Sequence, residues 1–169
     1  MTLPILLLVL AFVPMAFEAR RASANERALR AAGAREPPGD VYHLMQVAYP
    51  ISFVAIAVEA GMRQSRFTPA FAAGAVLFVA AKALKYWAIA SLGPRWAFRV
   101  LVPPHSSLVS SGPYRHMRHP NYVGVAGEFA GMALMAQAPV SGTVVVVTFA
   151  TLMFARIRVE ERALTDAQG

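Results

Sequence analysis

Two arginines and two histidines lie within five positions of one short stretch, SSGPYRHMRHPNY, at residues 110–122. Gly112-Pro113 is a turn signal. Pro120 disfavours helical geometry at His119 and suits the first turn of a helix that follows. The basic side chains are therefore expected in a constrained loop that leads into a helix N-terminus. The free N–H groups and positive dipole of such an end favour an anionic group, so the stretch predicts an anion-binding loop.

A second charged segment, FARIRVEERAL at residues 154–164, follows the last apolar stretch of the chain. If it is helical, Arg156 and Glu160 are four residues apart and share one helix face. A cation and an anion side by side can hold a zwitterion, and S-adenosylmethionine is one, with its carboxylate and its ammonium group. The two charged segments favour a pocket for this cofactor. A plain surface ion pair between Arg156 and Glu160 is the alternative interpretation.

Glu128 lies eight residues beyond Pro120 in an otherwise apolar segment. In a helix this places it about 12 Å deeper, at 1.5 Å per residue. An ionisable group inside a membrane segment is by default a candidate functional residue, and a packing residue bonded to a neighbouring helix is the alternative. The spacing of His116 and His119 is compatible with a metal, but a third ligand is missing nearby in the sequence, so we expect no metal site.

The elements that must position these residues are membrane helices. Of the 169 residues, 57% are hydrophobic and 15% are charged, and a soluble domain of this size could not bury that much apolar surface. We expect an all-α integral membrane protein with one domain over 1–169. Its N-terminal spans lie in 1–91, and the cofactor loop, a tight helical hairpin and the tail lie in 92–169. Five apolar segments approach the length of about 20 residues that a span requires: 3–17, 41–58, 67–89, 122–138 and 140–155.

The distribution of arginines predicts the orientation of these spans. With the N-terminus outside, the inner segments carry five, four and three arginines and the outer segments carry two. This positive-inside bias predicts that the cofactor pocket faces the cytosol, and short loops without a targeting signal favour a bacterial inner membrane. The formal charge of +7 does not indicate nucleic-acid binding, because the arginines lie in the gaps between apolar segments.

Two predictions concern polar residues near the inner ends of the spans. Residues 22–40 predict a short polar helix that ends at Gly33, followed by a Pro-Pro-Gly turn. Lys82 and Lys85 lie near the inner end of the third span, where long side chains can reach the membrane interface.

GPYRHMRHPNYVG, followed after one hairpin by RIRVEERAL, resembles the isoprenylcysteine carboxyl methyltransferase family, which includes phospholipid methyltransferase-like bacterial members. The motif-bearing part covers about residues 105–164. The resemblance implies an all-helical membrane enzyme that transfers a methyl group from S-adenosylmethionine, bound at the cytosolic side, to a lipophilic acceptor in the bilayer. The family often has a histidine eight residues before the motif tyrosine, where this chain has Ser106 and a histidine one place earlier.

The resemblance also assigns roles by position. It implies that Arg156 faces the acceptor and that Glu160 lies near the ammonium group of the cofactor. Arg156, Glu128 and Arg118 are the candidate catalytic residues. The residues expected to bind the cofactor are Ser106, Ser107, Leu108, Val109, Tyr114, His119, Pro120, Asn121, Tyr122 and Glu160.

The acceptor is expected to be methylated on oxygen. Methyl transfer from a sulfonium is an in-line displacement, so the protein mainly has to align donor and acceptor. A carboxylate acceptor of the isoprenylcysteine type needs no base, whereas a phenol, with a pKa of about 10, needs a base or a cation. The sequence GVAGEF around Glu128 resembles a bacterial subgroup associated with O-methylation of alkylresorcinols and alkylpyrones. We therefore favour a phenolic lipid acceptor, with Glu128 as its base or orienting group.

Two other classes of protein remain as alternatives. Membrane sterol reductases, which use NADPH, carry an RHPNY-like stretch on a related helical scaffold. Their tail usually has an Arg-Asp-Glu run, whereas this chain has Val159-Glu160-Glu161, and the NADPH phosphate would demand additional arginines. In a non-catalytic scaffold or small transporter, the basic loops would reflect topology alone. That reading leaves the paired RHPxY and RxxxEE motifs unexplained.

Overall fold

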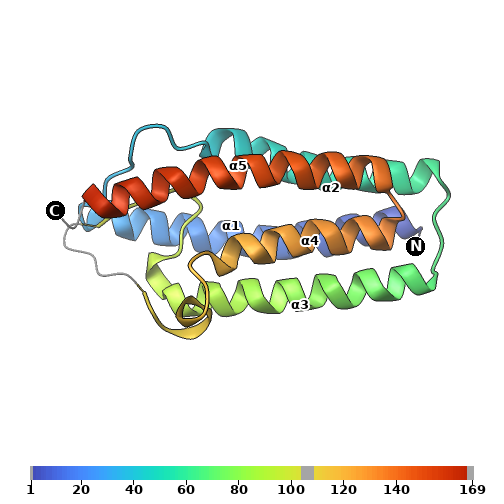
Figure 1. The fold of residues 1–169 in the computed structure, drawn as a ribbon, viewed down its shortest axis with the longest axis horizontal. Helices are drawn as coiled ribbons and strands as arrows, with labels where there is room; N and C mark the ends of the chain where they lie inside the picture. Colours follow the sequence, from blue (N-terminus) through green and yellow to red (C-terminus); the bar gives the residue numbers. More distant parts are fainter. Residues whose placement is uncertain (1, 104–108, 167–169) are drawn as a thin grey trace.

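The computed structural model describes residues 2–103 and 109–166, which form long antiparallel helices (Figure 1). Two single 3-10 turns, η1 (Gly93–Arg95) and η2 (Gly112–Arg115), lie between α3 and α4. We call the end where α1, α3 and α5 finish the basic end. The long helices are α1 (Leu3–Ala31), α2 (Tyr42–Met62), α3 (Pro69–Leu92), α4 (Pro120–Ala136) and α5 (Pro139–Asp166).

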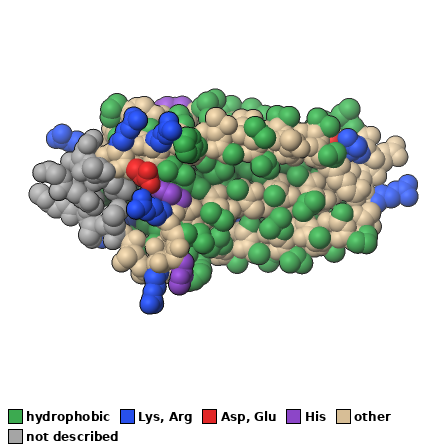
Figure 2. All heavy atoms as spheres, viewed as in Figure 1, with side chains coloured by type: hydrophobic (Ala, Val, Ile, Leu, Met, Phe, Trp, Pro, Cys, Tyr) green, Lys and Arg blue, Asp and Glu red, His purple; other side chains and the backbone are tan. Residues whose placement is uncertain are grey.

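The helices have the length and composition of an integral membrane protein, which confirms the expected all-α membrane class. Within the described residues, four segments are long and apolar enough to cross a bilayer: Leu3–Ala31, Tyr42–Met62, Pro69–Arg95 and Pro139–Ala163. The fifth expected span, α4, has 17 residues, somewhat fewer than the roughly 20 that a span requires. Figure 2 shows hydrophobic side chains over the middle of the molecule and basic side chains gathered toward its ends.

Helix α1 does not stop where the first apolar segment stops. The expected separate helix in residues 22–33 is wrong, because α1 continues without a break to Ala31. Residues 18–31 are rich in alanine, glutamate and arginine, which are strong helix formers, so the chain has no reason to break there. The helix ends at the expected place, and Gly33 has a φ of 84°, the left-handed conformation that commonly terminates helices.

Helices α3 and α4 approach closely through glycines. A Cβ atom on Gly131 would lie 2.7 Å from the Phe78 amide nitrogen, and one on Gly74 would lie 2.7 Å from the Gly131 carbonyl oxygen. Small residues at such positions allow membrane helices to pack backbone against backbone. Further along the same contact, a Cβ on Gly124 would lie 3.0 Å from the Lys85 Cβ. The contact therefore places a lysine of α3 directly against α4.

The last two helices form the tight hairpin that the sequence predicts. Gln137 adopts a left-handed conformation with a φ of 50°, and Pro139 starts α5 after a single further residue. The Glu59 carboxylate accepts hydrogen bonds from the Ser141 amide at 2.6 Å and from the Ser141 hydroxyl at 2.5 Å. A carboxylate at this position satisfies free N–H groups of the first turn of α5. The contact fixes the hairpin to α2.

Candidate active site

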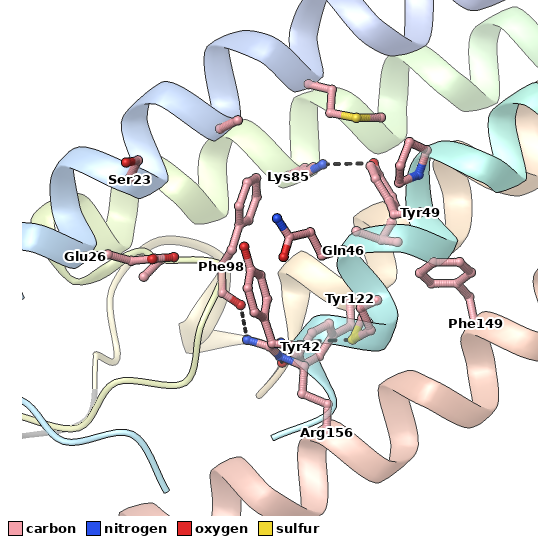
Figure 3. Close-up of a pocket in the computed structure, with 16 residues that line it drawn as sticks. Ser23, Glu26, Tyr42, Gln46, Tyr49, Lys85, Phe98, Tyr122, Phe149 and Arg156 are labelled. Carbon is pink, nitrogen blue, oxygen red and sulfur yellow. Dashed lines mark hydrogen bonds between the residues drawn. The ribbon is translucent and has the colours of Figure 1, made fainter. Parts of the chain in front are cut away.

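A cavity of ≈ 470 Å³ lies inside the bundle, in the half nearer the basic end. Its walls come from α1, α2, α4 and α5, with Lys85 of α3 and the Ala97-Phe98 segment completing them. This volume is within the usual range for small-molecule sites. Figure 3 shows Arg156 and Phe98 on one side of the cavity and Lys85 with Tyr49 on the other.

Arg156 is buried at the wall of this cavity. Its Nε donates to the Tyr122 hydroxyl at 2.9 Å, one Nη donates to Asp40 Oδ1 at 3.3 Å, and the other Nη donates to the Phe98 carbonyl oxygen. Only 6% of the residue is exposed. The alternative of a plain surface ion pair with Glu160 is therefore wrong. The planar guanidinium is held by three partners at once, which a lysine could not reproduce.

Tyr122 connects this arginine to Glu160. The Tyr122 hydroxyl accepts from Arg156 and donates to Glu160 Oε2 at 2.9 Å. Arg156 and Glu160 do lie on one face of α5, as the spacing predicts, but a tyrosine from α4 stands between them. This hydrogen-bonded chain joins the start of α4, which carries the RHPNY motif, to the end of α5, which carries the RxxxEE motif.

Other motif residues gather around the same point. The ring centroids of His119 and Tyr122 lie 5.6 Å apart, and His119 Nε2 lies 3.5 Å from Glu161 Oε1. Burial and the negative charge of Glu160 raise the pKa of Tyr114. Tyr114 is therefore close enough to Glu160 to interact with its charge. The start of α4, the η2 turn and the end of α5 thus form one polar wall.

The other residues expected to bind the cofactor differ in burial, and some lie outside the described residues. Pro120 is buried, Val109 is half-buried, and Ser106, Ser107 and Leu108 lie outside the described residues. The buried Oδ1 atom of Asn121 has no hydrogen-bond partner among the described residues. The side chain of His119, the N-cap of α4, makes no capping hydrogen bond. The polar wall therefore offers both an acceptor and a helix N-terminus to a ligand.

Arg118, an expected catalytic residue, lies on the surface away from the cavity. Its side chain is 87% exposed, and one Nη lies 3.5 Å from Glu161 Oε1. Arg118 is absent from the described residues that line the cavity. Arg118 is therefore a surface cation at the basic end and has no contact with the cavity among the described residues.

Glu128 belongs to a cluster of four charged side chains, which we call the buried quartet: Glu18, Lys82, Lys85 and Glu128. Each lysine contacts both carboxylates. Lys82 Nζ lies 3.0 Å from Glu18 and 3.2 Å from Glu128, and Lys85 Nζ lies 2.7 Å from Glu18 and 3.2 Å from Glu128. The expectation that Lys82 and Lys85 reach the membrane interface is wrong, because two carboxylates inside the bundle provide nearer partners for their charges.

Tyr49 links the buried quartet to the cavity. Its hydroxyl donates to Glu128 Oε2 at 2.5 Å and accepts from Lys85 Nζ at 3.2 Å. Tyr49 and Lys85 line the cavity, as Figure 3 shows, whereas Glu128 is fully buried behind them. The Tyr49 ring packs edge-on against Phe129 and Phe149. This wall therefore presents a phenol and an ammonium group, both backed by a carboxylate.

Glu18 is one of the site residues that sequence reasoning missed. The first apolar segment ends at residue 17, so Glu18 reads as the first residue of a polar loop. Two features could have found it. The helix-forming sequence continues past it, and Lys82 and Lys85, three residues apart on one helix face, require anionic partners if they lie within the membrane.

Comparison with known proteins places several residues of this site within the match to one protein family. Residues 74–166 match the sequence model of the isoprenylcysteine carboxyl methyltransferase (ICMT) family, a range that contains Lys82, Lys85, Glu128 and both charged motifs. The uncharacterized protein YpbQ of Bacillus subtilis (strain 168) is 30% identical over 161 residues, which are 95% of this chain and 96% of that protein.

A second bacterial relative is more distant. An uncharacterized protein of Haemophilus influenzae (strain ATCC 51907 / DSM 11121 / KW20 / Rd) is 25% identical over 142 residues, 83% of each chain. No solved structure matches the chain. On the family match and the similarity to the Bacillus protein, the chain belongs to the isoprenylcysteine carboxyl methyltransferase family and is an integral membrane methyltransferase.

Proposed function

We propose that this protein transfers a methyl group from S-adenosylmethionine to an oxygen atom of a lipophilic acceptor that enters the cavity from the bilayer. The observation that carries the proposal is the hydrogen-bonded chain from Glu160 through Tyr122 to Arg156. It connects a polar wall suited to a charged cofactor with a membrane cavity suited to an apolar acceptor. The two substrates would then meet in the cavity, between Arg156 and the wall formed by Tyr49 and Lys85.

The polar wall has the groups that a zwitterionic cofactor needs. The Glu160 carboxylate would pair with the cofactor ammonium, and the positive dipole at the N-terminus of α4 would favour the cofactor carboxylate. The buried Asn121 Oδ1, which has no partner among the described residues, can accept a further hydrogen bond. Bound there, the cofactor would supply a sulfonium methyl group. The other residues proposed to line its site are Ser106, Ser107, Leu108, Val109, Tyr114, His119, Pro120 and Tyr122.

The acceptor is proposed to approach between α1 and α2. Ala19 and Ser23 of α1 and Gln46 of α2 line the cavity, and all three are exposed on the surface of the bundle. Met15, Met45 and other apolar side chains continue the lining inward. A route past Ala19, Ser23 and Gln46 would lead to methionines, which adapt to an irregular chain, and so would suit a lipid tail.

The cavity is proposed to face the cytosol of a bacterial inner membrane. The arginine-rich segments all lie at the basic end, close to the cavity, and positively charged loops favour the cytosolic side. The relatives in Bacillus and Haemophilus are bacterial proteins. Membership of a methyltransferase family does not favour the NADPH-dependent reductase or the non-catalytic scaffold.

A phenolic lipid of the alkylresorcinol or alkylpyrone type is the acceptor that we favour over an isoprenylcysteine-like carboxylate. The reason is the carboxylate of Glu128, which reaches the cavity through the Tyr49 hydroxyl. A phenol must lose its proton to become a good nucleophile, and a carboxylate has already done so.

The proposal is tested by methyl transfer from isotope-labelled S-adenosylmethionine in detergent-purified protein. One acceptor probe is an alkylresorcinol, and the other is a farnesylated cysteine derivative. We expect label in the alkylresorcinol and loss of labelling in Glu160→Gln. The matched control is Glu161→Gln, because Glu161 is the neighbouring carboxylate on the more exposed side of α5. Label in neither probe would refute oxygen methylation of these lipid classes.

A further inference from the structure

The buried quartet has balanced charge and touches the cavity at one point only. Its two ammonium groups and two carboxylates form four N–O contacts of at most 3.2 Å. Among its four members, Lys85 lines the cavity and the other three do not. A cluster that served only to hold helices together would not need to reach the cavity. The contact point, formed by Lys85 and the Tyr49 hydroxyl, is where an acceptor would meet the cluster.

The hydrogen bonds of Tyr49 leave room for one more partner. Its hydroxyl donates its proton to Glu128 and accepts one N–H from Lys85. A hydroxyl oxygen can accept two hydrogen bonds, so one acceptor position remains for a group in the cavity. A hydroxyl of a bound ligand is a group that could donate to it.

We infer that Tyr49 and Glu128 form a proton relay for the acceptor hydroxyl, with Lys85 beside the oxygen that becomes methylated. The inference rests on the proposed function and specifies the acceptor of the same site as a neutral, weakly acidic O–H group. Tyr49 and Lys85 contact the acceptor, and Glu128 acts through Tyr49. Glu18 and Lys82 are positioning residues that keep Lys85 and Glu128 charged inside the bundle.

The proton transfer balances without a further reactant. The acceptor O–H gives its proton to the Tyr49 oxygen while the Tyr49 proton moves to Glu128 Oε2. The quartet then has one excess positive charge beside one negative oxygen, so the total charge of the site is unchanged. Protonation of Glu128 also frees the Lys85 N–H that faced it, and this N–H can turn to the new oxyanion.

The methyl transfer follows from the oxyanion. A lone pair on the acceptor oxygen forms a bond to the methyl carbon of S-adenosylmethionine, and the carbon–sulfur bond breaks with its electrons remaining on sulfur. The products are the methyl ether and neutral S-adenosylhomocysteine. The proton on Glu128 returns through Tyr49 to water when the product leaves the cavity.

A carboxylate acceptor would make little use of this arrangement. It has no proton to give, so a carboxylate behind Tyr49 would have no role in its reaction. Both cations among the described lining residues already face carboxylates: Lys85 faces the quartet, and Arg156 lies 3.3 Å from Asp40. The chemistry of the wall therefore fits a phenolic or enolic hydroxyl better than a carboxylate.

The relay is tested with two acceptors of different acidity and the variant Tyr49→Phe, which keeps the aromatic packing. One probe is an alkylresorcinol, and the other is a nitro-substituted alkylphenol that is already ionised at the assay pH. General base catalysis typically contributes about 100-fold or more, so we expect Tyr49→Phe to lower kcat by that factor with the alkylresorcinol. With the ionised probe we expect kcat near that of the wild type.

The matched control is Tyr86→Phe. The Tyr86 ring centroid lies 5.8 Å from Lys82 Nζ of the same cluster, but Tyr86 does not belong to the described cavity lining. We expect this variant to keep its activity on both probes. Calorimetric binding of S-adenosylhomocysteine to each variant verifies that the cofactor site is intact.

The outcomes separate the relay from the proposed function. Equal losses on both probes, or no loss on either, would overturn the relay and leave the methyltransferase proposal standing. A wild-type protein that binds S-adenosylhomocysteine but methylates neither probe would refute the phenolic acceptor and the relay together. Selective loss on the un-ionised probe alone supports both.

Discussion

The buried quartet has two positive and two negative charges, so we expect the stability effect of changing one member to depend on the others. Glu128→Gln removes one of two carboxylates and leaves Lys82 and Lys85 sharing Glu18 alone. Glu128 is fully buried and the Lys85 side chain is only 4% exposed, so the unpaired charge is largely shielded from bulk water. Removing one partner of a buried ion pair typically costs about 3–5 kcal/mol. We expect a loss of unfolding free energy of that size, and a similar loss for Lys82→Met.

The double variant Lys82→Met/Glu128→Gln restores charge balance. It leaves Lys85 and Glu18 as a pair 2.7 Å apart, and both replacements have nearly the original volume. Replacing a complete buried ion pair by uncharged residues is often nearly neutral. We therefore expect the double variant to be more stable than either single variant, which is the signature of strong coupling between the two positions.

The assay is unfolding in mixed micelles, followed by tryptophan fluorescence. The chain has two tryptophans, and Trp96 is buried with 3% exposure, so its emission should respond to unfolding. Glu161→Gln is the control, because a surface pair is worth at most about 1 kcal/mol. A double variant that loses the sum of the two single losses would refute the account of a charge-balanced cluster.

Two further predictions concern packing and the site. Gly131→Val should prevent stable folding, because its Cβ would lie 2.7 Å from the Phe78 backbone nitrogen. The control Ala73→Val, at an exposed position of α3, should unfold like the wild type in the same mixed-micelle unfolding assay. Arg156→Lys should raise KM for the acceptor about 10-fold or more, since one ammonium cannot reproduce the bonds to Tyr122, Asp40 and the Phe98 carbonyl; a steady-state assay with unchanged KM would count against a role for Arg156 in orienting the acceptor.

The fold could be predicted from the sequence where local signals were decisive. The apolar segments gave the helices, and Ala138-Pro139 predicted the hairpin because proline suits a first helical turn. The continuity of α1 was mispredicted, because hydropathy ends the apolar segment at residue 17, whereas the helix-forming residues that follow extend the same helix to Ala31. The close contact of α3 and α4 depends on glycines that face each other only after folding.

Only part of the candidate site could be predicted from the sequence, because many of its contacts depend on how the helices pack. Motif spacing brought Arg156 and Glu160 to one helix face, but the Tyr122 hydroxyl between them depends on how α4 and α5 pack. The partners of Glu128 come from two other helices, α2 and α3. Such long-range pairing has no local sequence signal, so Glu128 was found as a candidate while the buried quartet around it was not.

The central claim is that the polar wall binds S-adenosylmethionine. Calorimetric titration of detergent-purified protein with S-adenosylhomocysteine and, separately, with NADPH tests it most directly, alongside the variants Glu160→Gln and His119→Ala. We predict micromolar binding of S-adenosylhomocysteine that is lost in both variants, and no binding of NADPH. Binding of NADPH alone, or S-adenosylhomocysteine binding that survives in both variants, would contradict the assignment of this wall as the cofactor site.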